Sequence, residues 1–409
     1  MLSYDNEESY SDSDHRKIIK DMKLARFEEN APGQVFWLPK GWFMFRAVES
    51  FIRDMISRDG YEEVNSPQMM SQGLWERSGH WEKYSENMIL ASHDESRSGD
   101  VYAMKPMSCP AHVLMFKSES RSWKDLPLRI SEFGRCVRYE PSGSLQGMMR
   151  LRAFTQDDGH IFCSESQVED ESVRFIKLVL DIYEKLGFSD VEVRFSDRPK
   201  KRIGSDEIWD KAEHALIAAA EKAGVSVVHS HGEGAFYGPK LEFSLKDSKG
   251  RVWQCGTLQV DFVLAERFGA NFVNSDNERE APVILHRAVL GSLERFIAIM
   301  LENNGGRMPA WMMKEQVVIM PVSERHQAFC EDLDKDLRKS GIRSVIDGRP
   351  EKIGRKVRDS LIRRDPVFIV IGDKEVESGV LSVRAGGGEA EQIIRSEAPS
   401  ILKYVMDKI

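Results

Sequence analysis

The feature that most constrains the fold is an alternation of side chains in the stretch RLRAFTQDDGH, which spans residues 150–160. Alternate side chains of an extended strand point to the same face of a sheet. One face of this strand would carry a row of polar and aromatic groups: Arg150, Arg152, Phe154, Gln156, Asp158 and His160. A second extended segment, 128–139, precedes it, and the sequence EPSG between them has turn chemistry. The two segments therefore predict a pair of antiparallel strands.

The segments around this pair alternate between helical and extended patterns. Apolar residues recur at helical spacing over 42–59, and helices are also predicted over 164–186, 206–223 and from about 290 to a stop at Gly305 and Gly306. Ser164 with Gln167 forms a capping box at the start of the second helix. Strands are predicted over 61–67 and 257–264. Gln254 has the wrong parity for the polar face of the second strand, and Gly256 permits a bulge that corrects it.

The C-terminal part of the chain has a different pattern. Strands predicted over 316–322, 343–346 and 367–372 are separated by helices, which indicates a small α/β domain. A boundary falls near the sequence NNGGRMPAW. We therefore expect a tail and short helix over residues 1–30, a domain on an antiparallel sheet over 31–308, and an α/β domain over 309–409.

Composition excludes a few classes of protein. The 409 residues are 41% hydrophobic, so the chain can bury hydrophobic cores. Its net charge is −8, so the total charge does not indicate nucleic-acid binding. Residues 338–364 contain ten Lys or Arg against three Asp or Glu, which fits a solvated helix surface as well as a binding patch. Five scattered cysteines suggest no disulfide framework, and no apolar run is long enough to span a membrane. We expect a cytoplasmic protein without a membrane partner.

Two kinds of chemistry are suggested by residue type and spacing. Arg138 and Arg150 on facing strands suit a polyphosphate, and Phe154 could stack on a nucleobase, although a ladder of surface charges fits the pattern too. The sequence contains neither a P-loop nor a GxGxxG motif. Metal binding is left open in the same way: Cys109 lies near His112 and Cys163 near His160, but without zinc-knuckle spacing, and buried cysteines with hydrogen-bonded histidines are the alternative.

Five longer blocks together resemble a known family. CVRYEPSG followed by RLRAFTQDDGHIFC resembles motif 2 of the class II aminoacyl-tRNA synthetases, in the form found in threonyl-tRNA synthetases. KPMSCPAH and AFYGPKLEF with WQCGTLQVDF are similar to two further blocks of that family, and LHRAVLGSLERFIAIM resembles motif 3. YEEVNSPQMMSQGLWERSGHW resembles the motif 1 region, which forms the dimer interface in this class. The resemblance runs from about Asp14 to the C-terminus.

The resemblance implies a fold and a reaction. The fold would be an α+β catalytic domain on an antiparallel sheet, followed by a small α/β anticodon-binding domain. The reaction would be ATP-dependent ligation of L-threonine to threonine tRNA through a threonyl-adenylate, in a homodimer, with Mg²⁺ beside ATP. A paralogue that loads another acceptor, or that binds tRNA as a regulator, is the alternative.

The resemblance also implies roles for single residues. One zinc ion per subunit would be held by Cys109, His160 and His286, and it would recognise threonine. ATP would contact Arg138, Glu140, Arg150, Phe154, Gln254, Thr257 and Arg295. Threonine would contact Gln156, Asp158, Tyr237, Gln259 and Ser292. The catalytic set would be Arg138, Lys240, Arg295 and His80, where His80 either assists attack by the tRNA or has a structural role.

The chain departs from the family pattern in two places. Typical bacterial members carry editing domains upstream of the core, and almost nothing precedes the core here, so we expect a form that lacks them and releases seryl-tRNA uncorrected. In the last domain the family's Asn-Glu-Lys-Ile-Gly reads PEKIG, with Pro350 first, and Gly386 and Gly387 replace expected basic residues. The anticodon contacts implied are Lys352, Arg358, Arg364, Glu375 and Arg384. Because proline and glycine offer no side-chain hydrogen bond to a base, we expect weakened anticodon selectivity.

Overall fold

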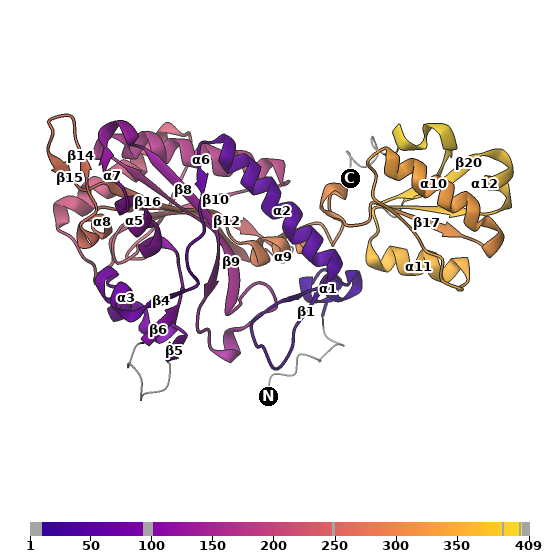
Figure 1. Ribbon diagram of the computed structural model, residues 1–409, viewed down its shortest axis with the longest axis horizontal. Helices are drawn as coiled ribbons and strands as arrows, with labels where there is room; N and C mark the ends of the chain where they lie inside the picture. The colour runs from indigo at the N-terminus through magenta and orange to yellow at the C-terminus, as the bar shows by residue number, and fades with distance from the viewer. Residues whose placement is uncertain (1–9, 93–100, 248–249, 387, 401, 403–409) are drawn as a thin grey trace.

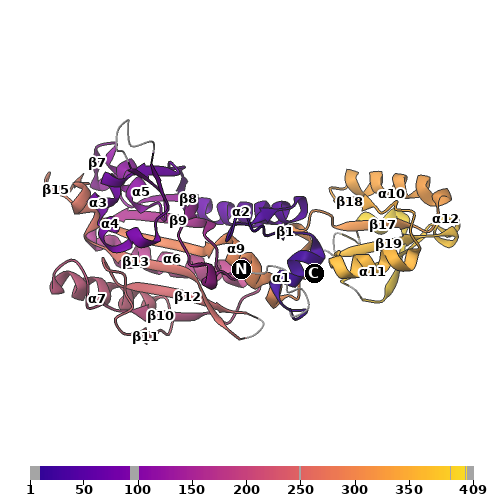
Figure 2. The same ribbon diagram turned by 90° about the horizontal axis from the view of Figure 1, so that it is seen from below.

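The computed structural model describes residues 10–92, 101–247, 250–386, 388–400 and 402. The first nine residues of the expected tail, and Gly387, lie outside the described residues. Two bodies lie side by side along the longest axis of the molecule, and Figures 1 and 2 show them from two directions. None of the described helices is long and apolar enough to cross a membrane.

The larger body is built on an eight-stranded sheet. Its strands run in the order β11 (Val228–Ser230), β10 (Glu192–Ser196), β12 (Lys240–Lys246), β13 (Val252–Asp261), β16 (Val283–Ser292), β9 (Ala153–Cys163), β8 (Leu128–Val137) and β3 (Glu62–Glu63). Only the two outermost pairs are parallel. The predicted hairpin of β8 and β9 is present, with Val137 opposite Ala153. The expectation of a domain on a mainly antiparallel sheet is confirmed.

One face of this sheet carries the main hydrophobic core. Apolar side chains of β10, β12, β13 and β16 pack there against α2 (Pro39–Arg58), α6 (Val168–Lys185), α7 (Asp206–Lys222) and α9 (Leu293–Asn303). The start of α6 is fixed by the predicted capping box, in which the Ser164 amide donates to Gln167 Oε1 at 3.0 Å. The opposite face is covered at one end by α5 (Cys109–Lys117) and α8 (Leu264–Phe268). That face is polar where β9, β13 and β16 meet, so it is the face that can hold a site.

Three strand predictions need correction. The segment 61–67 contains only the short strand β3. The next strand, β4 (Met69–Ser71), belongs to a separate small sheet, in which β6 (Val101–Met104) lies between β4 and β5 (Leu90–Ser92). The strand predicted to end at Leu264 ends at Asp261, whose Oδ1 accepts hydrogen bonds from the next amides and starts α8. Strand β9 begins only at Ala153, because Arg150 closes a tight turn with Gln146 and the Arg152 amide donates to the Gly33 carbonyl.

The remaining strands are short. A further small sheet runs in the order β15 (Arg279–Glu280), β14 (Phe272–Val273) and β7 (Arg121–Ser122), and β1 (Ala25–Arg26) pairs with β2 (Phe36–Trp37). Helices α3 (Gln72–Ser78) and α4 (His80–Tyr84) follow β4 and bring the motif 1 region beside α5 and α8.

The smaller body is the predicted α/β domain. Its sheet runs in the order β18 (Ser344–Ile346), β17 (Val317–Pro321), β19 (Val367–Ile371), β20 (Val380–Ala385) and β21 (Ala390–Ile394). The first three strands are parallel and the last two are antiparallel additions. Helices α10 (Gln327–Lys339) and α11 (Ile353–Arg363) pack on opposite faces, and α12 (Asp373–Ser378) follows β19.

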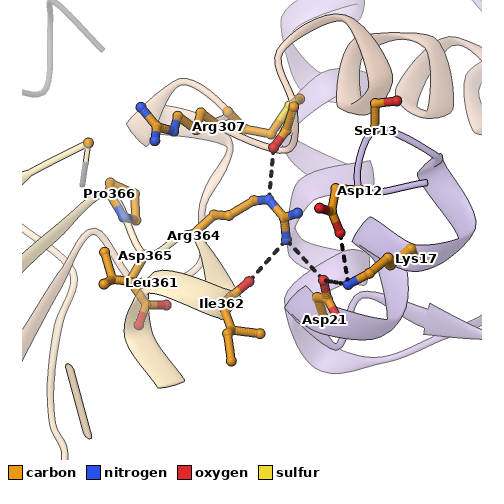
Figure 3. Close-up of a pocket in the computed structure, with 13 residues that line it drawn as sticks. Asp12, Ser13, Lys17, Asp21, Arg307, Leu361, Ile362, Arg364, Asp365 and Pro366 are labelled. Carbon is orange, nitrogen blue, oxygen red and sulfur yellow. Dashed lines mark hydrogen bonds and ion pairs between the residues drawn. The ribbon is translucent and has the colours of Figure 1, made fainter. Parts of the chain in front are cut away.

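Arg364 fastens this domain to the rest of the protein. It caps the end of α11 in the left-handed conformation (φ 54°) and points towards α1 (His15–Met22), as Figure 3 shows. Its Nε donates to the Gly305 carbonyl at 2.8 Å, and its Nη1 lies 3.5 Å from Asp21 Oδ2. A crevice of about 540 Å³ lies between the two bodies here. Arg364 is therefore occupied at a junction, which argues against the anticodon role expected for it.

We expect Arg364→Ala to loosen this junction. Loss of a charged hydrogen bond costs about 1–2 kcal/mol at a half-buried site, which raises the open population by roughly 5- to 30-fold. Limited proteolysis of the 304–315 connector should accelerate by a similar factor when opening precedes cleavage. Arg355→Ala is the matched control, because Arg355 is exposed on the same helix and pairs only with Glu351 among the described residues. Equal cleavage rates for the two variants would contradict the role of Arg364.

Candidate active site

The strand registers place the expected site residues in rows across the polar face of the large sheet. Directly paired residues of antiparallel strands point to the same face. The pairs Lys240–Gln259, Gln259–His286 and His286–His160 form one continuous row across four strands. The row beside it contains Thr257, Ala288 and Asp158. The strand registers thus bring six expected site residues together: Lys240, Gln259, His286, His160, Thr257 and Asp158.

Gln254 reaches the same face through the predicted bulge. On β13, Gly256 pairs with Phe243 and Gln254 with Ser244, so that Cys255 is skipped. Gln254 is exposed and Thr257 partly exposed, whereas Cys255 and Gly256 are buried between them. A Cβ at Gly256 would lie 2.9 Å from the Tyr183 hydroxyl, so the bulge also requires the small residue. The parity argument made from the sequence is confirmed.

A small cavity opens above these rows. Its volume is about 110 Å³, which suits a group no larger than a small amino-acid side chain. The residues that line it are Met107, Cys109, Arg138, Gln156, Asp158, His160, Tyr237, Thr257, Gln259, His286 and Arg287. All three expected metal ligands and four of the five expected threonine contacts are among them.

Cys109, His160 and His286 form a buried cluster at the floor of the cavity. Their three ligand atoms lie within 4.8 Å of one another, although they come from α5, β9 and β16. One thiol and two imidazoles are the donors that zinc accepts in catalytic sites. Burial raises the pKa of the Cys109 thiol well above its usual value and lowers the pKa of His160. A buried thiol is readily deprotonated only when a nearby cation stabilises the thiolate, so the donor set fits a metal ion.

The second nitrogen of each histidine is held by a buried partner. His286 Nε2 donates to Asp261 Oδ2 at 3.0 Å, which leaves Nδ1 as the ligand atom. His160 Nδ1 lies 2.7 Å from His112 Nδ1, and His112 Nε2 donates to Glu132 Oε2 at 3.0 Å. Such partners fix the tautomer and orientation of metal-binding histidines. The row of imidazoles is therefore set in place by the protein itself.

Glu132 is the carboxylate at the end of the hydrogen bonds that run from His160 through His112. Lys105 Nζ contacts one of its oxygens and Ser66 Oγ donates to the other at 2.7 Å. Burial by itself raises the pKa of Glu132, but hydrogen bonds from His112, Lys105 and Ser66 outweigh it and lower the pKa to about 2. Neither residue was predicted from the sequence: Glu132 is remote in sequence from every ligand, and Lys105, although it lies close to Cys109, contacts Glu132 rather than a ligand. Asp261 was visible as a polar member of its strand, and His112 as a neighbour of Cys109.

His80 lies against the metal-binding cluster. It is only 1% exposed, its Nδ1 lies 2.8 Å from Ser78 Oγ, and its Nε2 lies 3.8 Å from Cys109 Sγ. Burial lowers its pKa to about 4. Of the two roles left open by the sequence, these contacts support the structural one.

The wall of the cavity presents hydrogen-bonding groups in fixed orientations. The Tyr237 hydroxyl donates to Gln259 Oε1 at 2.6 Å, and Gln259 Nε2 donates to Thr257 Oγ1 at 3.3 Å. Asp158 Oδ2 accepts the Ser108 amide at 3.1 Å and keeps its other oxygen available among the described contacts. Ser292 differs from the expectation, because its hydroxyl caps α9 and donates to Glu294 Oε2 at 3.0 Å.

Arginines gather at the other end of the site. Arg138 Nε donates to the Pro106 carbonyl at 3.0 Å, and its guanidinium lies 5.1 Å from the Phe154 ring centroid. Arg295 Nε donates to the Met149 carbonyl at 2.9 Å, and Nη1 to the Gln254 carbonyl at 3.1 Å. Burial lowers the pKa of Arg295 but leaves it charged at neutral pH. Two fixed guanidiniums beside an aromatic ring suit a nucleotide polyphosphate.

Three of the expected residues are paired with one another or with neighbours. Arg150 Nε donates to Glu140 Oε2 at 2.9 Å, so a nucleotide that uses both side chains must share or break this pair. Lys240 Nζ donates to Glu242 Oε1 at 2.7 Å on the same strand. Arg150 is 52% exposed, and an exposed pair of this kind costs little to open.

Most of the basic side chains in residues 338–364 already bind to polar groups of the protein itself. Seven of its ten basic residues have polar partners: Arg338, Arg343, Arg349, Arg355, Lys356, Arg363 and Arg364. Glu375 accepts the Gly372 amide at 2.8 Å at the start of α12. Lys352 and Arg358 are exposed and form no ion pair within the described residues.

Arg384 emerges on the same side as these two residues. It pairs with Phe368 across β19 and β20, so both side chains point to one face of the sheet. Ile353 and Val357 of α11 pack on that face beside Phe368. Lys352, Arg358 and Arg384 therefore form a candidate anion-binding surface, whereas Arg364 and Glu375 face other contacts.

The chain matches two family models. Residues 92–304 match the tRNA synthetase class II core domain of the G, H, P, S and T enzymes, and residues 316–404 match the anticodon binding domain. Proteins named threonine--tRNA ligase from Psychrobacter arcticus and Thiobacillus denitrificans are 52% and 51% identical over 92% of this chain. The chain spans about 58% of the length of these curated relatives.

Two solved structures indicate the same family, and each match covers nearly the whole length of both chains. A crystal structure described as the RNA binding domain of threonyl-tRNA synthetase from Cryptosporidium parvum superposes with a TM-score of 0.85 at 34% identity, covering 96% of this chain and 98% of the other. A crystal structure described as that of a putative threonyl-tRNA synthetase from Aeropyrum pernix superposes with a TM-score of 0.81 at 32% identity, covering 97% of this chain and 95% of the other. From its core, its anticodon-binding domain and these relatives, the chain belongs to the threonyl-tRNA synthetase family of class II tRNA synthetases.

Proposed function

We propose that the protein ligates L-threonine to threonine tRNA in two steps, by forming threonyl-adenylate from threonine and ATP and then transferring the threonyl group. The observation that carries this proposal is the position of the Cys109, His160 and His286 cluster at the floor of a cavity that also contains Asp158. A metal-binding end and an arginine end lie on one sheet face, so an amino acid and a nucleotide can meet there. We assign this chemistry to residues 31–308 and tRNA binding to 309–409.

In this proposal the cluster holds one zinc ion per subunit. Bound zinc would accept the amino group and the hydroxyl of threonine as ligands. Threonine and valine are nearly isosteric, and an apolar pocket separates such pairs by only about a hundredfold. A valine side chain would leave Asp158 without a donor, and sites built around a hydroxyl discriminate by roughly 10⁴-fold or more. The small volume of the cavity, about 110 Å³, supports selection by size as well.

The arginine end would bind ATP with Mg²⁺. Arg138 and Arg295 are pre-positioned by backbone carbonyls, so they can neutralise charge on the phosphates without reorganising. The Phe154 ring lies beneath Arg138, where a nucleobase could insert. Opening of the Glu140–Arg150 pair would free the carboxylate for the adenine amino group and the guanidinium for a phosphate.

The transfer RNA and a second subunit complete the proposed assembly. Lys352, Arg358 and Arg384 supply positive charge for the anticodon arm. A homodimer would form through the motif 1 region, residues 61–81, and this is supported by the position of β3 at the edge of the large sheet.

The first prediction concerns metal content. We expect purified protein to contain about one zinc ion per chain, and Cys109→Ala to lose both the metal and threonine-dependent ATP–pyrophosphate exchange, because the remaining two imidazoles cannot hold zinc tightly. Elemental analysis and exchange kinetics measure the two effects. Cys163→Ala is the matched control, since Cys163 is equally buried on β9 but outside the cluster. Active wild-type protein without zinc would refute the proposal.

The second prediction concerns discrimination by the hydroxyl. In Asp158→Ala we expect the ratio of kcat/KM for threonine over valine to fall about 10- to 100-fold, the loss typical of one hydrogen bond to a charged group. The ratio of threonine over serine should stay nearly constant in the same exchange assay, because both substrates carry the hydroxyl. Equal changes in the two ratios would show that Asp158 does not read this group.

The third prediction concerns the anticodon. Because Pro350 and Gly386 offer no side-chain hydrogen bonds, single replacements at the second and third anticodon bases should lower kcat/KM for aminoacylation by far less than a thousandfold. Arg384→Ala should weaken tRNA binding, and Lys335→Ala serves as the control, because Lys335 is exposed on α10, which packs on the opposite face of the sheet. A loss of about a thousandfold for a single base corresponds to roughly 4 kcal/mol and would show that selectivity is retained.

A further inference from the structure

A further buried histidine, outside the cluster of Cys109, His160 and His286, lies at the arginine end of the site. His15 is the first residue of α1 and is only 1% exposed. Its ring lies between Glu302, near the end of α9, and the turn 146–150 that leads into β9. Because α1 is remote in sequence from both, this contact was not visible in any motif.

His15 makes three hydrogen bonds with these two elements. Its backbone amide and its Nδ1 both lie near Glu302 Oε1, at 3.1 and 2.7 Å. Its Nε2 lies 3.2 Å from the Met148 amide. A backbone N–H only donates, so Nε2 must be the acceptor, and the proton of a neutral ring must then sit on Nδ1 and point to Glu302. One tautomer satisfies both ends.

The turn that His15 holds also holds an arginine of the site. The Met149 carbonyl accepts the Arg295 Nε hydrogen bond at 2.9 Å. Arg295 and Glu302 are both on α9, two turns apart and therefore on one side of the helix. The contacts close a ring that runs from Glu302 through His15, Met148 and Met149 to Arg295 and back along α9. Arg150 follows Met149 directly, so both arginines depend on the position of this turn.

The turn is shaped to admit His15. Gly147 has a φ of 49°, and a Cβ there would lie 2.3 Å from His15 Nε2. Met148 and Met149 are each 1% exposed, so the turn is packed as well as hydrogen-bonded. The remainder of α1 is anchored by Ile18, Ile19 and Met22 in the main core. The turn and α1 therefore pack closely around the His15 ring.

We propose that His15 is a positioning residue of the nucleotide site, which sets Arg295 and Arg150 through the turn 146–150. This inference rests on the proposed binding of ATP at the arginine end. The N-terminal helix is then part of the machinery for ATP rather than only a cover over the core.

Two variants separate the two ends of the imidazole. His15→Gln places an acceptor at the distance of Nε2 and can still take the Met148 amide. His15→Asn keeps a donor at the distance of Nδ1 but is too short to reach Met148. In threonine-dependent ATP–pyrophosphate exchange, we expect His15→Asn to raise the KM for ATP about three- to tenfold and His15→Gln to stay within about twofold of the wild type. The KM for threonine should not change in either variant.

Gly147→Ala provides an independent route to the same effect. Its Cβ would displace the His15 ring, so we expect the same selective rise in the KM for ATP. Combined with His15→Asn, it should add little, because both changes remove one contact. Zinc content and thermal unfolding of each variant show whether the protein has folded.

The outcomes distinguish this inference from the proposed function. If all variants lose stability while the KM values for ATP and threonine rise together, or if His15→Asn and His15→Gln behave alike, His15 is only a structural residue. If the wild-type protein neither binds ATP nor catalyses exchange, the proposed function itself is wrong.

Discussion

The site depends on two buried lines of hydrogen bonds that meet at the cluster of Cys109, His160 and His286. One runs from Glu132 through His112 to His160 and the other from Asp261 to His286, and every member is less than 10% exposed. Where they meet, His160 Nε2 and His286 Nδ1 lie 3.0 Å apart, each with a lone pair when its other ring nitrogen donates. Such a line is stable only when each donor meets an acceptor, because an unpaired polar group in a dry interior costs about 1–3 kcal/mol. Carboxylates at both ends let neutral imidazoles keep defined tautomers, with their free lone pairs turned towards Cys109. The geometry of the cluster of Cys109, His160 and His286 follows from this arrangement.

The two faces of the sheet meet this requirement in different ways. On the core face, Asp157 is fully buried beside Arg287 and accepts the Val289 and Leu290 amides at 2.6 and 2.8 Å, while burial raises its pKa to about 7. On the site face, the adjacent Asp158 accepts one amide and turns towards the cavity. The two neighbouring aspartates point to opposite faces of the sheet, because successive side chains of a strand alternate, and they therefore have different roles. One ties β9 to β16, and the other is left for a ligand.

The arginine end is organised by backbone rather than by side chains. Arg138 and Arg295 donate to backbone carbonyls of loops and of β13. The positions of the two guanidiniums therefore depend on the positions of those segments. This makes the site sensitive to elements outside the large sheet. Helix α1 contacts the turn 146–150 through His15 and the second domain through Asp21 and Arg364. A short helix therefore touches both the arginine end of the site and the junction between domains.

The sequence by itself determined the local structure and the facing of side chains. Period-two alternation placed Phe154, Gln156, Asp158 and His160 on one face, parity required the bulge near Gly256, and capping residues marked the start of α6, because these signals depend only on near neighbours. The resemblance to a known family supplied the ligand set Cys109, His160 and His286, which local spacing could not. Only the tertiary structure decided the partners of these residues. Glu132 behind His112, His15 between α9 and a distant turn, and Arg364 at the domain junction join segments tens to hundreds of residues apart. No periodicity records such contacts, because they depend on how the sheet and helices pack.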